Sequence, residues 1–311
     1  MSDPRVKYEQ MIADLRNQLR PQREWGEGRG VLMVVGHFVV GIAAGGWLIS
    51  LLFNSPTGLL LSYSLGLIGG LTHLGFLGHP ARFWRMATRV KTSWIARGFL
   101  GLTLFLLGGL LHLPAALEIQ GMWVAGSIPA KFGSALALVG MVILIGYMGF
   151  VYTTSKAIPF WNSPLHPALY VAYAVRGGVA TVLVARAIEA SQEQANQLMF
   201  LWIGVTAVVG LLLALELYGA YTNESNAARR SVRDFVAGRL APYFYGGILV
   251  IGFVVPSYLV WNGGSEPPSP GVMAMVGAAS AVGDFFMKYA TIRAGVHRPV
   301  WTRMRPGGVQ S

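Results

Sequence analysis

The sequence of 311 residues contains no cysteine. Without cysteine the chain can form no disulfide bond and can hold no iron–sulfur cluster on thiolates of its own. Charge is also scarce, because charged residues make up 12% of the chain, against about 25% in soluble domains. Residues 1–29 mix charges of both signs and lack the apolar core of a signal peptide. We therefore expect an integral membrane protein whose first span drives its insertion.

The sequence is rich in long apolar segments, with 54% hydrophobic residues and a mean hydropathy of +0.52. Eight apolar segments approach the ~20 residues that a helix needs to cross the hydrocarbon layer, and a lone span must satisfy its own backbone. The sequence predicts an all-α polytopic membrane protein, with its eight transmembrane helices in two four-helix bundles. The segments are 30–53, 58–76, 94–113, 130–153, 166–187, 197–220, 241–262 and 271–292.

Three regions are therefore expected: an amphipathic N-terminal arm over 1–29, helical from 4 to 20, a transmembrane domain over 30–292, and a basic tail over 293–311. Lysine and arginine give the orientation. The side that holds both termini and the even-numbered junctions collects all but three of the 24 cations, the exceptions being Lys131, Arg176 and Arg186. Since basic loops stay in the cytoplasm, we expect both termini on the cytoplasmic side of a bacterial inner membrane.

Ionisable groups inside spans are costly in a bilayer, so each one is a candidate functional residue. Most of them lie in the half of the membrane that adjoins the basic loops, whereas His112 lies near the opposite end. Structural explanations exist as well: Asp284 and Lys288 share a helix face and could neutralise each other, or Arg176 could pair with Asp284. The clustering favours function. Its members are His37, His73, Tyr147, Tyr152, Arg176, Glu216, Asp284 and Lys288.

Two redox chemistries could use this cluster. A quinone needs donors for its carbonyl oxygens, apolar walls and a proton route, and His, Tyr, Trp and buried acids supply these. A b-type haem needs axial histidines, for which only His37 and His73 have matching depth. Zinc or di-iron sites are disfavoured, because no histidine and carboxylate cluster has ligand spacing. A secondary transporter, with charges at mid-depth in glycine-rich spans, is an alternative of another class. Transporter spans are often broken at mid-depth, but here the spans are not evidently broken by proline, and Pro256 is the main exception.

Two loops carry recognisable motifs. The residues from His73 to Gly98 read HLGFLGHPARFWRMATRVKTSWIARG, and Ile158 to Pro167 read IPFWNSPLHP. Both resemble signatures of the membrane anchors of the dimethyl sulfoxide reductase and polysulfide reductase type, the DmsC and NrfD/PsrC superfamily. Eight spans without cysteine fit this resemblance. One departure is Gly98, which stands where the dimethyl sulfoxide branch usually has glutamate.

The resemblance implies a quinone-binding membrane anchor that uses menaquinone or ubiquinone. It would exchange electrons with a ferredoxin-like subunit carrying four [4Fe–4S] clusters, which serves a molybdopterin catalytic subunit. This chain would hold no haem, metal or iron–sulfur cluster, would not act on the final substrate, and would contact the lipid bilayer but no nucleic acid. The expected quinone-binding residues are His37, His73, Arg82, Trp94, Arg97, Tyr147 and Tyr152. Proton transfer is expected from Arg176, Glu216, Asp284 and Lys288.

Overall fold

The computed structural model describes residues 5–6, 8–9, 11, 19–263 and 267–298. Within these residues every regular element is a helix, and eight helices are long and apolar enough to cross a membrane. The predicted all-helical architecture with eight spans is therefore confirmed. The spans are α2 (Val31–Leu52), α3 (Pro56–Phe76), α4 (Trp94–Ala116), α5 (Ile128–Thr153), α6 (Leu165–Ile188), α7 (Ala195–Thr222), η3 (Tyr243–Val254) continued by α9 (Val255–Asn262), and α10 (Pro270–Arg293).

Serine marks the start of three of these spans. The hydroxyls of Ser55, Ser93 and Ser269 each accept a hydrogen bond from the backbone N–H three residues further on. Pro56 and Pro270 follow two of these serines at the first helical position, where a missing N–H costs nothing. These caps satisfy backbone donors that would otherwise be unpaired at the ends of the helices.

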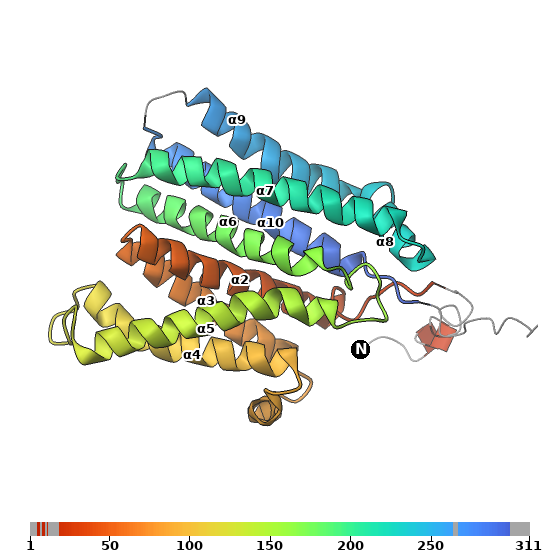
Figure 1. Ribbon diagram of the computed structural model, residues 1–311, viewed down its shortest axis with the longest axis horizontal. Coiled ribbons are helices and arrows are strands. Elements are labelled where there is room, and N and C mark those ends of the chain that lie inside the picture. The colour runs from red at the N-terminus through yellow and green to blue at the C-terminus, as the bar shows by residue number, and fades with distance from the viewer. Residues whose placement is uncertain (1–4, 7, 10, 12–18, 264–266, 299–311) are drawn as a thin grey trace, which may run out of the picture.

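Contacts between the helices divide the eight spans into two groups of four, and the two groups lie one above the other in Figure 1. In the first group, α4 packs along α5 and α2 along α3, while the second group joins α6, α7, α10 and the η3–α9 span. The two groups meet where α2 lies against α6, and these two helices are the most buried of the eight. The candidate functional site lies along this seam.

Glycine permits the close contact between α4 and α5. A Cβ added at Gly101 would lie 3.1 Å from the carbonyl oxygen of Gly140, and one at Gly108 would lie 2.6 Å from that of Gly133. Gly101 and Gly108 are seven residues apart in α4, and Gly133 and Gly140 are seven residues apart in α5. The small residues of each helix therefore stay on one face over two helical turns. Small side chains let backbones approach in this way in membrane helix pairs.

The seventh span is irregular. Its first part, η3, is a π-helix, and Pro256 lies at the start of the α9 segment that continues it. A Cβ on Gly252 would lie 2.7 Å from the Cα of Gly283 in α10, so these helices also touch through glycine. π-Helices are rare and are frequent at functional sites, and here the Gly252 carbonyl accepts a hydrogen bond from Arg176.

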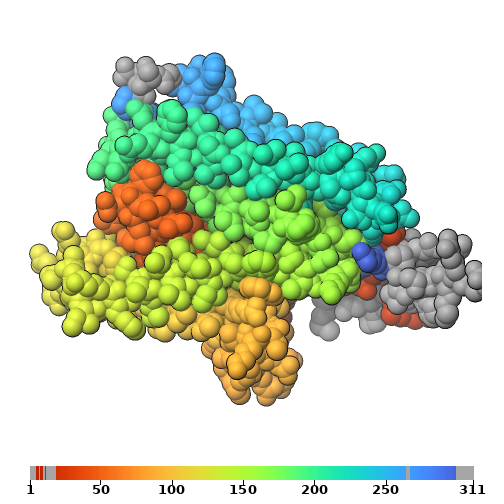
Figure 2. Space-filling model, in the orientation of Figure 1, coloured from red at the N-terminus to blue at the C-terminus, as the bar shows by residue number. Residues whose placement is uncertain are grey.

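The segments that flank the first and last spans are tied together at one end of the molecule. Pro21 and Val296 form an isolated β-bridge, and Arg293 makes a 2.7 Å ion pair with Glu27. The predicted amphipathic helix over 4–20 lies mostly outside the described residues, as do residues 299–311 of the predicted basic tail. Two shorter helices, η2 (Pro80–Arg89) and α8 (Asn226–Val236), lie in the loops after α3 and α7. Of these, η2 projects from the body of the molecule (Figure 2).

Candidate functional site

The centre of the site is His37, held between two tyrosines. Its Nδ1 lies 2.5 Å from the Tyr152 hydroxyl and its Nε2 lies 2.6 Å from the Tyr147 hydroxyl. His37 belongs to α2 and both tyrosines to α5, and all three side chains are buried. A neutral imidazole has one N–H donor and one acceptor nitrogen, so one tyrosine accepts a hydrogen bond from His37 and the other donates one.

His73 lies beside this triad. Its ring centroid is 5.2 Å from that of His37, and its Nδ1 donates to the carbonyl oxygen of Gly69, 2.7 Å away. The buried Nε2 has no hydrogen-bond partner among the described residues. With Nδ1 carrying the proton, the neutral ring presents Nε2 as an acceptor. Buried polar atoms usually have partners, so this nitrogen is a candidate ligand-binding atom.

Two glycines make room for the cluster. A Cβ at Gly36 would lie 2.6 Å from Nδ1 of His73, and one at Gly98 would lie 2.7 Å from the ring of Tyr147. These distances are shorter than real Cβ contacts. A glutamate at position 98, as in the dimethyl sulfoxide branch, would therefore displace Tyr147. Glycine at position 98, where that branch has glutamate, is therefore what leaves room for the Tyr147 ring.

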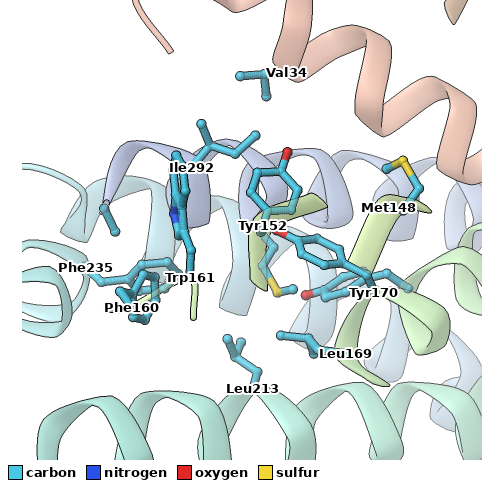
Figure 3. Packing of buried hydrophobic residues seen from close by; sticks show 14 of the residues in the cluster. Val34, Met148, Tyr152, Phe160, Trp161, Leu169, Tyr170, Leu213, Phe235 and Ile292 are labelled. Atoms are coloured by element: carbon cyan, nitrogen blue, oxygen red, sulfur yellow. The ribbon is translucent and has the colours of Figure 1, made fainter. Parts of the chain in front are cut away.

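A buried lysine, Lys288, lies next to the tyrosines. The Nζ atom of Lys288 is 3.4 Å from the ring centroid of Tyr170 and 4.9 Å from that of Tyr152, and the two rings stack on each other (Figure 3). This Nζ is buried and has no hydrogen-bond partner within the described part of the chain. The tyrosine rings stabilise it through cation–π interactions. The alternative in which Lys288 neutralises Asp284 is wrong, because Asp284 pairs elsewhere.

The partner of Asp284 is Arg176. Their side chains form a buried ion pair of 2.6 Å between α10 and α6. Arg176 also donates to Thr206, at 3.1 Å, and to the carbonyl of Gly252, so one guanidinium joins four spans. This is one of the two pairings that the sequence suggested for Asp284. The second carboxylate oxygen of Asp284 has no hydrogen-bond partner in the described residues.

A small cavity connects the two groups. Its volume is about 30 Å³, which is room for one or two water molecules. It is too small for a quinone ring, so it suits water and protons. Its polar lining consists of His37, Tyr170, Tyr173, Asp284 and Lys288.

A second buried acid, Glu216, lies between Tyr170 and the end of the spans that adjoins the basic loops. Glu216 of α7 accepts hydrogen bonds from the Ser163 hydroxyl, at 2.6 Å, and from His166 Nδ1, at 2.9 Å. Ser163 and His166 both belong to the IPFWNSPLHP segment. The His166 ring packs edge-on against Tyr170, with centroids 4.8 Å apart. The second motif thus supplies Ser163 and His166, which hold the Glu216 carboxylate at the end of the polar cluster.

Indole rings cover the cluster on this side. Trp161 donates from Nε1 to the Thr291 carbonyl, at 3.0 Å, and its ring lies 5.4 Å from Tyr152. Trp25 stacks on Trp161 with centroids 5.3 Å apart. Figure 3 places Trp161 beside Tyr152 and between Phe160 and Ile292. The linker before the first span therefore helps to close the site.

Three of the predicted quinone-binding residues lie in the loop between α3 and α4 or in the first turn of α4. Trp94 stacks on Phe150, with centroids 4.8 Å apart. The Arg97 guanidinium lies 4.3 Å from the Trp94 ring and donates to the carbonyls of Val90 and Lys91. Arg82 lies exposed on η2. The structure brings together His37, His73, Tyr147 and Tyr152, with Lys288 beside them, but it does not bring Arg82 to them.

Sequence reasoning missed four residues of the cluster. These are Ser163, His166, Tyr170 and Tyr173. A signal for three of them was present: His166, Tyr170, Tyr173 and Arg176 recur every three or four residues and so share one face of α6. This stripe leads from the IPFWNSPLHP segment to the Arg176–Asp284 pair. Over the described residues, no group of three His, Asp or Glu side chains could hold a metal ion.

These features define a class: a multi-pass membrane protein with a buried histidine and tyrosine cluster beneath one end of its helices. The sequence matches the family described as "Polysulphide reductase, NrfD" over residues 25–299, and the chain belongs to this family. It is also similar to Protein NrfD of Escherichia coli (strain K12), with 25% identity over 260 residues, which cover 77% of this chain and 81% of that protein. Family and fold together support the role of a membrane subunit in a redox complex.

Proposed function

We propose that this chain is the quinone-binding membrane anchor of a multi-subunit molybdoenzyme. In this role it exchanges electrons between the menaquinone or ubiquinone pool and a ferredoxin-like subunit with four [4Fe–4S] clusters, and that subunit serves a molybdopterin catalytic subunit. The observation that carries the proposal is the buried cluster of His37, Tyr147, Tyr152 and His73, with an unpartnered nitrogen on His73.

The chemistry of the cluster fits the needs of a quinone. A bound quinone would supply two-electron chemistry that takes up or releases two protons at its oxygens. His73 offers Nε2 to a quinol hydroxyl, and Tyr147 and Tyr152 offer hydroxyl groups already hydrogen-bonded to His37. A proton accepted by one of these groups can pass along hydrogen bonds to its neighbour.

Buried polar groups extend this route away from the histidines. The cavity lined by His37, Lys288 and Asp284 can hold water between them. On the other side of Tyr170, His166 and Glu216 form a hydrogen-bonded pair. We assign the proton-transfer role to Asp284, Lys288 and Glu216, with Arg176 holding Asp284 in place. His166 joins this set.

Electron transfer needs a partner because the chain has no cysteine to hold a cluster. The exposed cations of α8, Arg229 and Arg233, lie at the end of the molecule where the flanking segments of the first and last spans meet (Figure 1). A basic face of this kind attracts an acidic partner and orients its approach. We place the iron–sulfur subunit over this end, on the cytoplasmic side by the distribution of cations.

The geometry gives less support to the two alternatives. A haem iron would need one nitrogen of each histidine, but both nitrogens of His37 face tyrosine hydroxyls and Nδ1 of His73 is bonded to Gly69. A transporter would use the charges at mid-depth, and Arg176 and Asp284 are bound to each other there. An optical b-haem spectrum, or transport by the chain without partners, would favour these alternatives.

The test uses the complex purified through its membrane subunit and assayed with a water-soluble quinol analogue. His37→Ala and His73→Ala should each lower quinol turnover by an order of magnitude or more, while iron and molybdenum still co-purify. His112→Ala is the matched control, because this histidine lies near the opposite end of α4 against Trp47. If both cluster variants keep normal turnover and assembly, the assigned site is wrong.

A further inference from the structure

The loop between α3 and α4 carries a helix that the proposed function leaves without a role. This helix, η2, is a 3₁₀-helix of ten residues, and none of its residues is buried. It connects two membrane spans, so it must lie at a boundary of the bilayer. We propose that η2 lies in the headgroup layer beside the first bundle and binds the phosphates of anionic lipids.

The geometry of the helix sorts its side chains into three ridges. In a 3₁₀-helix, side chains at positions i and i+3 eclipse each other. One ridge therefore turns to the protein, where Phe83 packs edge-on against Phe99 of α4, with centroids 5.7 Å apart. A second ridge is apolar and exposed, and the third is basic. The first ridge consists of Pro80, Phe83, Met86 and Arg89, the second of Ala81, Trp84 and Ala87, and the third of Arg82, Arg85 and Thr88.

The exposed ridges match the two chemistries of a membrane surface. The Trp84 side chain is 57% exposed, and the Arg85 guanidinium lies 5.6 Å from its ring. Tryptophan favours the level of the lipid headgroups, where its ring meets apolar chains and its N–H meets polar groups. Arginine binds phosphate through paired N–H donors. Lipid phosphate would therefore be the ligand of Arg82, which is remote from the histidine cluster.

The position of η2 favours lipid over a protein partner. Figure 1 shows it end-on below α4, so that it runs across the direction of the spans, at the side of the first bundle. The adjoining turns of α3 and α4 expose Leu71 and Ile95, which are apolar residues of the kind that face lipid. The α8 helix and the linked terminal segments instead lie at the end of the molecule (Figure 1).

Both ends of the loop are held in place. Arg29 donates to the carbonyls of Gly75 and Leu77 at the end of α3. Arg97 donates to the carbonyls of Val90 and Lys91 just before α4. Two arginine clamps thus set the position of η2 relative to the spans, so that its exposed ridges face the same surroundings in every molecule.

The absence of cysteine makes a direct test possible. Ala87→Cys and Thr88→Cys each give the full-length protein a single thiol, on the apolar and the basic ridge respectively. A spin label on each thiol is examined in nanodiscs of phosphatidylcholine and phosphatidylglycerol, with oxygen and a water-soluble nickel complex as collision partners. We expect the label at position 87 to collide more with oxygen and less with nickel than the label at position 88, as a helix at the bilayer surface requires.

A second measurement tests the phosphate contacts. Arg82→Gln combined with Arg85→Gln should lower the selectivity for spin-labelled phosphatidylglycerol over phosphatidylcholine by roughly fivefold for each charge removed. The matched control removes two exposed cations from α8, by Arg229→Gln and Arg233→Gln, and should lower this selectivity less than the two changes on η2 do. An equal loss of selectivity from both pairs would contradict specific phosphate binding by η2. Equal nickel access at both positions of η2, or protection that appears only when partner subunits are added, would overturn the proposal.

Discussion

The buried ion pair between Arg176 and Asp284 allows a quantitative test of how the second bundle is held together. Arg176→Met would leave the Asp284 carboxylate buried without its partner 2.6 Å away. Loss of one member of a buried pair costs about 3–5 kcal/mol, and Asp284→Leu should cost as much. In Arg176→Met/Asp284→Leu neither charge of this pair is left buried, and the main remaining loss is that of the hydrogen bonds from Arg176 to the Gly252 carbonyl and to Thr206, at about 1–3 kcal/mol. The double variant should therefore be more stable than either single one.

The assay is a double-mutant cycle on the free energy of unfolding in mixed micelles. We expect a coupling free energy of at least about 2 kcal/mol between the two residues. The pair of Arg20 and Glu24 is the matched control, since its atoms are also 2.6 Å apart but its side chains are 51% and 56% exposed. An exposed pair contributes about 0–1 kcal/mol. Coupling below about 0.5 kcal/mol for the buried pair would refute the reasoning.

The same variants separate a structural role of the pair from a role in proton transfer. Asp284 lines the water-sized cavity next to His37, whereas Arg176 does not. The double variant should therefore recover stability but not quinol turnover, which should stay at least tenfold below that of the unchanged complex. Full turnover in the stable double variant would mean that the pair only holds helices together, and that Asp284 carries no protons.

Other predictions concern the two ends of the cluster. Tyr147→Phe should lower the free energy of unfolding by about 1 kcal/mol, for one hydrogen bond to His37, and should reduce quinol turnover in the purified complex. Gly98→Ala should cost about 1–3 kcal/mol through overpacking against Tyr147, and Tyr147→Ala in the same chain should relieve this strain in a thermal unfolding assay. Glu216→Leu should cost about 1–3 kcal/mol by leaving His166 unpaired, whereas Glu216→Gln, which still accepts a hydrogen bond, should cost less; equal losses would contradict this assignment.

The eight spans could be predicted because length and hydropathy alone specify a membrane helix. Partners across helices could not be predicted in the same way. Asp284 and Lys288 are four residues apart and share a face of α10, yet Asp284 pairs with Arg176 while Lys288 lies on the ring of Tyr170. Arg176 and Tyr170 both belong to α6, so one helical turn along α10 is enough to bring two residues of the same face against chemically different residues of one neighbouring helix. Spacing along one span therefore identifies a polar face without identifying its partners.

The contacts of the loop motif could not be predicted for a related reason. Its arginines suggested ligands, but Arg97 donates to the backbone carbonyls of Val90 and Lys91, and carbonyls have no signature in a sequence. Gly98 was noted as a missing glutamate, although its physical role is to leave space for the ring of Tyr147. An absent side chain at a helix contact is as informative as a present one, because it shows where another residue must fit.

The stripe on α6 links these observations. His166, Tyr170 and Tyr173 follow one another at helical spacing toward Arg176, and the structure connects each to a different helix: His166 to Glu216 of α7, Tyr170 to Lys288 of α10, and Tyr173 to the cavity beside His37 of α2. A polar stripe that served stability alone would find its partners within the stripe or along one neighbour. This one contacts three helices and leaves buried polar atoms on His166, Tyr170 and Tyr173 without partners in the described chain. Such unpaired atoms cost stability, which is consistent with a route kept open for water and protons.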